Sequence, residues 1–234
     1  MVETPAKKSD LGTRTASAIV MITVAGGALW LGGWLWSAFA VAVAIVVFAE
    51  WLGLVGKFAS GTSQHVIWTL LGVVYVGFAG IFLAALGNDQ IMGGGGFWLV
   101  VTLLSVVIGT DTGAYFTGRT LGGPKIAPAI SPSKTWSGLL GGMILAAVAM
   151  AGSAKLGIVN ISVAAALAIG AALAVVAQAG DFLESWMKRR AGVKDSGKLI
   201  PGHGGVFDRV DGLLAVTFSV GVGLLCSLAN ATDL

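Results

Sequence analysis

Long runs of apolar residues separated by short polar segments dominate the chain. Seven of them are long enough to cross a membrane, since a spanning helix needs about 20 largely apolar residues. They lie near residues 16–32, 34–55, 66–86, 97–116, 136–154, 161–180 and 209–228. A transmembrane β-barrel would instead show short segments of alternating apolar and polar residues. The pattern predicts an all-α, polytopic integral membrane protein with about seven transmembrane helices.

The chain is predicted to form one membrane domain preceded by a short tail. Residues 1–14 are polar and predict a cytoplasmic N-terminal tail, and residues 15–234 form the single transmembrane domain. The first apolar run does not resemble a cleavable signal peptide, because a second run follows almost at once and no small-residue cleavage site is visible. No internal repeat and no second domain is evident.

The composition agrees with this interpretation. Charged residues make up 11% of the chain and hydrophobic residues 56%, whereas soluble domains carry about 25% charged residues. The single cysteine excludes an internal disulfide framework, and with only two histidines we do not expect a structural zinc site. The 36 glycines suit helices that pack closely in a membrane.

The basic residues predict the orientation, because Lys and Arg collect on the cytoplasmic side of membrane proteins. If the N-terminus lies inside and seven spans follow, Lys155 is the only one of the 14 Lys and Arg residues that falls outside. We therefore expect a multi-pass protein of the cell (inner) membrane with a basic cytoplasmic face. Such a face suits phosphates and anionic lipid headgroups, although it could also serve only to set the topology.

Acidic residues gather near the same predicted surface. One face of the helix leaving the sixth span carries Asp181, Glu184, Ser185 and Lys188. Asp208 and Asp211 share a face at the start of the seventh span. Oxygen ligands without His or Cys partners suit Mg²⁺ better than zinc. The alternative is that these carboxylates only pair with neighbouring Lys and Arg residues.

Three further features could serve phosphate chemistry. The glycine cluster at 202–205 precedes a helix, where backbone N–H groups favour an anion, and its His203 could bind phosphate, transfer a proton or only shape the loop. Asp111 is an acid near the cytoplasmic end of the fourth span, where function is the usual reason for a charge. Ser131-Pro-Ser-Lys134-Thr135 is a polar turn that could bind phosphate, or simply cap the next helix through Ser133 or Thr135.

The pattern over residues 185–211, SxMKRx₄KDxGx₂IPxHGGVxDRVD, resembles the C-terminal signature of phosphatidate cytidylyltransferases, also called CDP-diacylglycerol synthases. Residues 111–119 and 131–136 are similar to another block of that family, and Glu50-Trp51 extends the similarity toward the N-terminus. Two positions depart from the family pattern: Ser133 stands where asparagine is usual, and Ser137 where an acid is usual. The chain is also shorter than typical members.

The resemblance implies that the protein joins CTP and phosphatidate to give CDP-diacylglycerol and pyrophosphate, with Mg²⁺ and a possible second cation as cofactors. It implies metal binding by Asp181 and Asp208. The expected catalytic residues are Asp181, Asp208, Asp211, Lys188 and Arg209. The expected substrate-binding residues are Asp111, Ser131, Ser133, Lys134, Arg189, Lys194, His203, Gly204 and Gly205. The expected partners are CTP, phosphatidate, membrane lipid and a second copy of the chain in a homodimer, without nucleic acid.

Two other functions compete with this one. A CTP-dependent lipid-alcohol kinase would use the same nucleotide but transfer the γ-phosphate. A transporter or lipid flippase would also tolerate glycine-rich spans and an acid such as Asp111. Against transport, the acids cluster at one predicted surface rather than at the membrane midplane, and no inverted repeat is visible.

Overall fold

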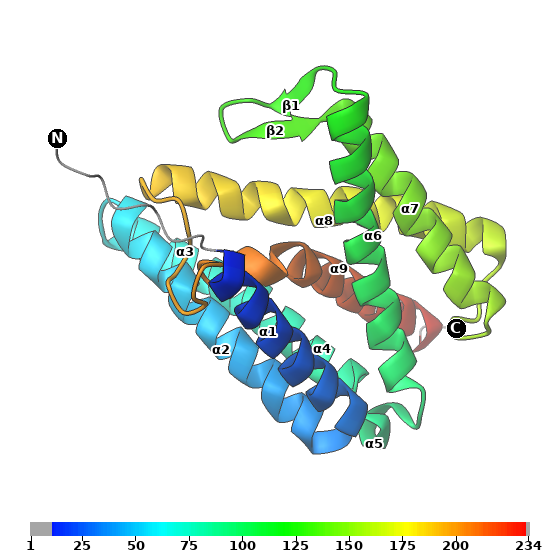
Figure 1. The fold of residues 1–234 in the computed structure, drawn as a ribbon. Helices are drawn as coiled ribbons and strands as arrows, with labels where there is room; N and C mark the ends of the chain where they lie inside the picture. The colour runs from blue at the N-terminus through cyan, green and yellow to red at the C-terminus, as the bar shows by residue number, and fades with distance from the viewer. Residues whose placement is uncertain (1–10, 233–234) are drawn as a thin grey trace, which may run out of the picture.

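The computed structural model describes residues 11–232 and is almost entirely helical (Figure 1). Seven helical segments are long and apolar enough to cross a membrane, which confirms the predicted fold class. They are α1 (Leu11–Leu31), α2 (Gly33–Phe58), the segment Thr62–Leu86, α6 (Gly96–Thr120), α7 (Trp136–Lys155), α8 (Val163–Arg190) and α9 (Phe207–Thr232). Residues 1–10 of the predicted tail lie outside the described part, and residues 11–14 begin α1.

The third span is divided into α3 (Thr62–Gly72), a π-helical turn (Val73–Gly77) and α4 (Phe78–Leu86). A short helix, α5 (Asp89–Met92), follows it, and the glycines at 93–95 then turn the chain into α6 with positive φ angles. Such angles favour glycine because it has no Cβ. The glycine run therefore forms a turn between two spans.

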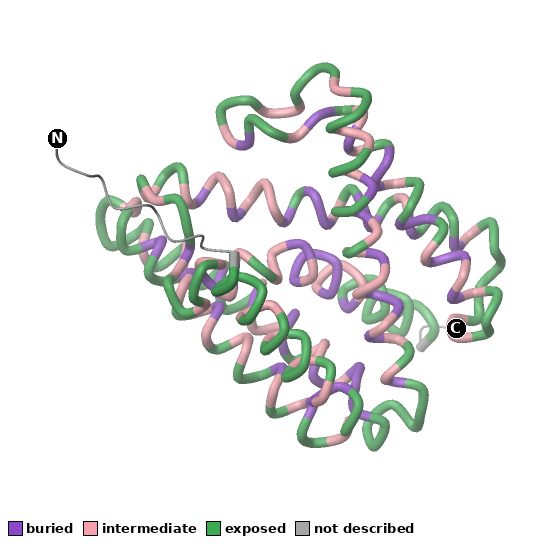
Figure 2. Tube along the Cα trace, in the orientation of Figure 1, coloured by how far each residue is buried: buried purple, intermediate pink, exposed green. Residues whose placement is uncertain are grey.

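Two close helix contacts define the packing around the site. A Cβ atom at Gly113 of α6 would lie 2.7 Å from the carbonyl carbon of Gly141 in α7, so the backbones meet directly. A Cβ at Gly180 of α8 would lie 2.6 Å from the carbonyl oxygen of Asp211 in α9. Small residues permit such approaches between membrane helices. Buried residues accordingly follow the inward faces of these helices, and exposed ones the outside (Figure 2).

A β-hairpin lies between α6 and α7, where only a polar turn was expected. Strands β1 (Lys125–Ala127) and β2 (Ser131–Thr135) pair antiparallel, and the hairpin stands beside α8 (Figure 1). Its sequence lacks the apolar alternation that predicts strands, and Pro132 is tolerated because a two-stranded hairpin has only edge strands. Of the two residues that could cap the next helix, Thr135 does so, since its hydroxyl accepts a hydrogen bond from the N–H of Gly138 at 3.1 Å at the start of α7.

Candidate active site

A cavity of about 530 Å³ lies where the end of α6, the hairpin, the start of α7 and the C-terminal half of α8 meet. Its size is typical of small-molecule sites. The polar residues that line it are Asp111, Tyr115, Arg119, Lys125, Ser133, Lys134, Thr135, Gln178 and Asp181. Four sequence-predicted residues therefore share one cavity, namely Asp111, Ser133, Lys134 and Asp181.

Asp111, Lys134 and Asp181 line this cavity, and Asp211 interacts electrostatically with all three. We call these four residues the cavity cluster. Lys134 Nζ forms an ion pair with Asp181 Oδ2 and also lies 5.3 Å from the centre of the Phe182 ring. Asp111 and Asp211 interact electrostatically with both partners of this pair. Three acidic side chains thus lie near one ammonium, and their oxygen atoms are the ligands that a hard cation prefers.

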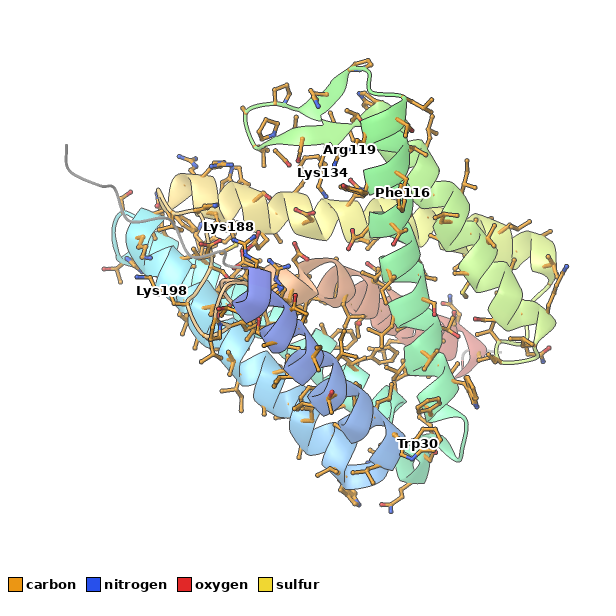
Figure 3. The ribbon with its side chains drawn as sticks, in the orientation of Figure 1. Trp30, Phe116, Arg119, Lys134, Lys188 and Lys198 are labelled. Atoms are coloured by element: carbon orange, nitrogen blue, oxygen red, sulfur yellow. The ribbon has the colours of Figure 1, made fainter. Side chains whose placement is uncertain are left out.

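Two further basic residues, Arg119 and Lys125, line the same cavity, and Arg119 and Lys134 lie near each other between the hairpin and α8 (Figure 3). Arg119 Nη1 donates a hydrogen bond to the Tyr115 hydroxyl at 2.7 Å, and its guanidinium lies over the Tyr115 ring. Lys125 Nζ lies 3.4 Å from the carbonyl oxygen of Ser133. Arg189 Nε donates to the carbonyl of Ile130 at 3.3 Å and so ties α8 to the hairpin. Acidic and basic side chains that line one cavity suit a metal-bound polyphosphate.

A second group of charged residues lies where α2, α8 and the segment before α9 meet. It consists of Glu50, Glu184, Lys188, Ser196 and Asp208, and we call it the loop cluster. Lys188 Nζ forms ion pairs with Glu184 at 2.6 Å and with Asp208 Oδ1 at 2.7 Å. The side chains of Glu184 and Asp208 are only 1% and 5% exposed. Breaking such a buried pair leaves an uncompensated charge, which is strongly destabilising.

Asp208 holds the loop cluster together. Its Oδ2 accepts hydrogen bonds from the N–H of Ser196 at 2.9 Å, the hydroxyl of Ser196 at 2.9 Å and the N–H of Gly205 at 2.8 Å. The N–H groups at the start of α9 thus face carboxylates of the protein. The anion at this helix N-terminus is therefore internal, which is the charge that the helix dipole favours.

The two predicted metal ligands belong to different clusters, because Asp181 pairs with Lys134 whereas Asp208 pairs with Lys188. No group of three or more His, Cys, Asp or Glu side chains within residues 11–232 is arranged to hold a metal ion. The carboxylates nevertheless fit magnesium, which usually takes one or two carboxylates and completes its shell with water and substrate phosphates. Asp181 meets this requirement because it faces the cavity.

The other predicted residues surround these clusters. His203 Nδ1 lies 2.8 Å from the Ser17 hydroxyl, which connects the loop before α9 to α1. Gly204 has a φ of 86°, and its neighbour Gly205 is buried against Ser196. Ser131 is buried at the start of β2, whereas Lys194 and Arg209 are exposed.

Sequence reasoning did not single out four residues that the structure brings into these clusters. Arg119, the last residue of the block at 111–119, and Lys125 have no predicted role in the site, although both line the cavity. The structure adds Gln178, which also lines it, and Ser196. Gln178 is a buried polar residue inside an apolar span, a signal that usually marks a site. Ser196 is one small polar residue in a polar segment, and nothing in its local sequence distinguishes it.

Comparison with known proteins gives one consistent answer. The sequence profile of the cytidylyltransferase family matches residues 57–226. A protein of Brucella suis biovar 1 named phosphatidate cytidylyltransferase is 37% identical, over 88% of this chain and 90% of its own length. A protein of the same name from Rickettsia bellii is 34% identical, over 89% of this chain and 88% of its own length. A third from Pseudomonas aeruginosa is 43% identical over 50% of this chain and 44% of its own.

Proposed function

The chain belongs to the cytidylyltransferase family, and from this premise we propose how its residues perform the reaction. The protein transfers the cytidylyl group of CTP to phosphatidate, giving CDP-diacylglycerol and pyrophosphate. A phosphate oxygen of phosphatidate attacks the α-phosphorus of CTP, forming a P–O bond, while the bond from that phosphorus to the β-phosphate oxygen breaks. Pyrophosphate leaves with that electron pair. Such transfers require positioning and charge neutralisation more than covalent chemistry.

We assign the triphosphate of CTP to the cavity that holds Lys134 and Asp181. This assignment rests on one observation: Lys134 and Asp181 line the same cavity as the basic residues Arg119 and Lys125. Guanidinium and ammonium groups neutralise the charge that develops on phosphoryl oxygens. Lys188, Arg189, Lys194 and Arg209 would supply further cationic contacts to the phosphates of either substrate, and Ser131 and Ser133 hydroxyl contacts.

Asp181 would hold Mg²⁺ from the cavity, and Asp208 would join it by exchanging its ion pair with Lys188 for the cation. Asp111 and Asp211 are the next candidates. When bound, Mg²⁺ would neutralise phosphate charge and orient the triphosphate. The two clusters are neighbours, because three residues separate Asp181 from Glu184 on α8 and Asp208 from Asp211 on α9, a rise of about 4.5 Å. A triphosphate with one or two cations could therefore contact both clusters.

The orientation follows from the basic residues counted in the sequence. We propose that the cavity opens toward the cytoplasm, where CTP is found, and that phosphatidate enters from the inner membrane. The acyl chains of phosphatidate would remain between the helices, near the cytoplasmic leaflet of the membrane. A homodimer, which the resemblance implies, stays a prediction that the mass of the detergent-solubilised protein would test.

Labelled CTP tests the assignment. The purified protein with phosphatidate and Mg²⁺ should move label from the α-phosphate of CTP into lipid, and removal of Mg²⁺ by a chelator should stop the transfer. A lipid-alcohol kinase would instead move label from the γ-phosphate, and a transporter would place neither label in lipid. Either of those results would contradict the proposal.

A further inference from the structure

Glu50, near the end of α2, receives three hydrogen bonds from residues about 150 positions later in the chain. Its Oε1 accepts from the N–H of Val206 at 3.0 Å, and its Oε2 accepts from the N–H of Phe207 at 2.8 Å and the Ser196 hydroxyl at 3.0 Å. The first N–H groups of a helix have no partner within the helix. Glu50 therefore caps α9 from a different transmembrane helix.

The surroundings leave the Glu50 carboxylate little freedom. A Cβ atom at Gly205 would lie 2.5 Å from Glu50 Oε2 and 2.6 Å from the backbone nitrogen of Gly197, and one at Gly197 would lie 2.7 Å from Glu50 Cδ. Two glycines thus form the slot that holds the carboxylate. The next residue, Trp51, is 1% exposed, and its ring packs against that of Phe207 with centroids 5.9 Å apart. The end of α2 is therefore docked onto the start of α9.

Ser196 connects Glu50 to Asp208. Its hydroxyl oxygen lies 3.0 Å from Glu50 Oε2 and 2.9 Å from Asp208 Oδ2. Because a hydroxyl has a single proton to donate, it donates to one carboxylate at a time and keeps both in reach. Asp208 in turn contacts Lys188 of α8. A continuous polar chain thus runs from α2 through the loop before α9 to α8.

We propose that Glu50 is a positioning residue for the cytidylyl transfer. It fixes the backbone of residues 206–207 and the Ser196 hydroxyl, and through them it directs the carboxylate of Asp208. Glu50 does not line the cavity, so it acts through Asp208 rather than on a substrate. This inference rests on the proposed role of Asp208 in the reaction.

The test compares Glu50→Gln with the wild type as purified full-length proteins. The amide keeps the size of the side chain, but it replaces one acceptor oxygen with an NH₂ group that faces N–H donors. Residues that orient metal ligands typically change affinity or activity by about 10–100-fold when mutated. We expect kcat to fall by that factor and the Mg²⁺ concentration for half-maximal rate to rise, with KM for phosphatidate unchanged. Binding of Mn²⁺ without substrates, followed by electron paramagnetic resonance, should weaken as well.

Asp89→Asn is the matched control. Asp89 Oδ1 accepts a hydrogen bond from the N–H of Gly96 at 2.7 Å, so it too places a carboxylate at the start of a helix, α6. It lies at the other end of that span from the cavity residues of α6. This variant should keep the wild-type kcat and Mg²⁺ dependence.

The outcomes are distinct. A lower melting temperature with wild-type kcat and Mg²⁺ dependence in Glu50→Gln would show a purely structural role and overturn the inference. If Glu50→Gln does not fold, Ser196→Ala is the second test, because it removes only the hydroxyl that links Glu50 to Asp208. A several-fold loss of kcat with a shifted Mg²⁺ dependence in Ser196→Ala supports the inference. A wild-type kcat and a wild-type Mg²⁺ dependence in that variant overturn it. Failure of the proposed function would look different, because Asp208→Asn would then remain active or the wild type would not transfer the α-phosphate.

Discussion

Asp181→Asn should abolish turnover while barely changing stability. The side chains of Lys134 and Asp181 are 16% and 32% exposed, and ion pairs reached by solvent contribute about 1 kcal/mol or less. For a chain of this size, about 1 kcal/mol moves the melting temperature by roughly 2–4 °C. The Ser185 hydroxyl donates a hydrogen bond to Asp181 Oδ1 at 3.2 Å, and the amide oxygen of the substituted side chain can still accept it.

The effect on the reaction should be far larger. The lost carboxylate is a proposed ligand of Mg²⁺, and the cation would neutralise the negative charge on the phosphoryl oxygens. Loss of one preorganised electrostatic contribution costs about 10²–10³ in kcat. We therefore expect at least a ~10³-fold loss, equivalent to about 4 kcal/mol of barrier. The increase in the activation free energy should thus be several times larger than the decrease in the free energy of unfolding.

The assay follows α-labelled CTP into lipid at saturating Mg²⁺, alongside thermal unfolding of the same detergent-purified samples. Asp89→Asn serves again as the matched change, because it removes an exposed acid at the other end of α6. A purified Asp181→Asn enzyme with a rate within about threefold of the wild type would refute the assigned role. A rate loss matched by extensive unfolding would refute the separation of catalysis from stability.

Three further predictions test other parts of the site. Asp208→Asn should stop Mg²⁺-dependent turnover. Unlike Asp181→Asn, it should also lower the free energy of unfolding by about 3–5 kcal/mol, because it breaks a buried ion pair, and an unchanged melting temperature would contradict that loss of stability. Gly205→Ala should cost at least about tenfold in rate, since its Cβ would lie 2.5 Å from Glu50 Oε2, whereas Gly223→Ala, with no atom within 4 Å of its Cβ, should remain active. A reporter fused after the last residue should read as extracytoplasmic, and a cytoplasmic signal would show that the count of seven spans is wrong.

The membrane spans could be predicted because their signal is local. An apolar run of about 20 residues has few alternatives in a membrane, and all seven predicted spans match helices of the structure. The sixth apolar run ends near residue 180, but α8 continues to Arg190. The polar residues that follow, such as Asp181, Glu184 and Lys188, end the apolar run but not the helix. They are spaced three or four residues apart, so they share one face of it. That extension carries Asp181, the proposed ligand of Mg²⁺, and the Glu184–Lys188 ion pair.

The grouping of the acids could not be predicted in the same way. The resemblance predicts that Asp181 and Asp208 bind one metal, but it does not say which basic side chain each carboxylate contacts. Lys134 reaches Asp181 from the hairpin, an element that has no apolar alternation to reveal it. Glu50 reaches the loop cluster from 146 residues before Ser196. Such partners depend on how distant segments pack, and a single sequence does not contain that information.

The packing of α8 against α9 accounts for both clusters at once. Gly180 lies against the carbonyl of Asp211, which places Asp181 beside Asp211. Glu184 lies about one turn further along α8, where Lys188 forms ion pairs with both Glu184 and Asp208. Antiparallel helices advance equally in opposite directions, so the steps 181 to 184 and 211 to 208 cover the same rise of about 4.5 Å. A single glycine contact therefore sets the register of four carboxylates. Since Glu50 fixes the start of α9, it sets the same register from the opposite side, and this is why a residue outside the cavity can control the geometry within it.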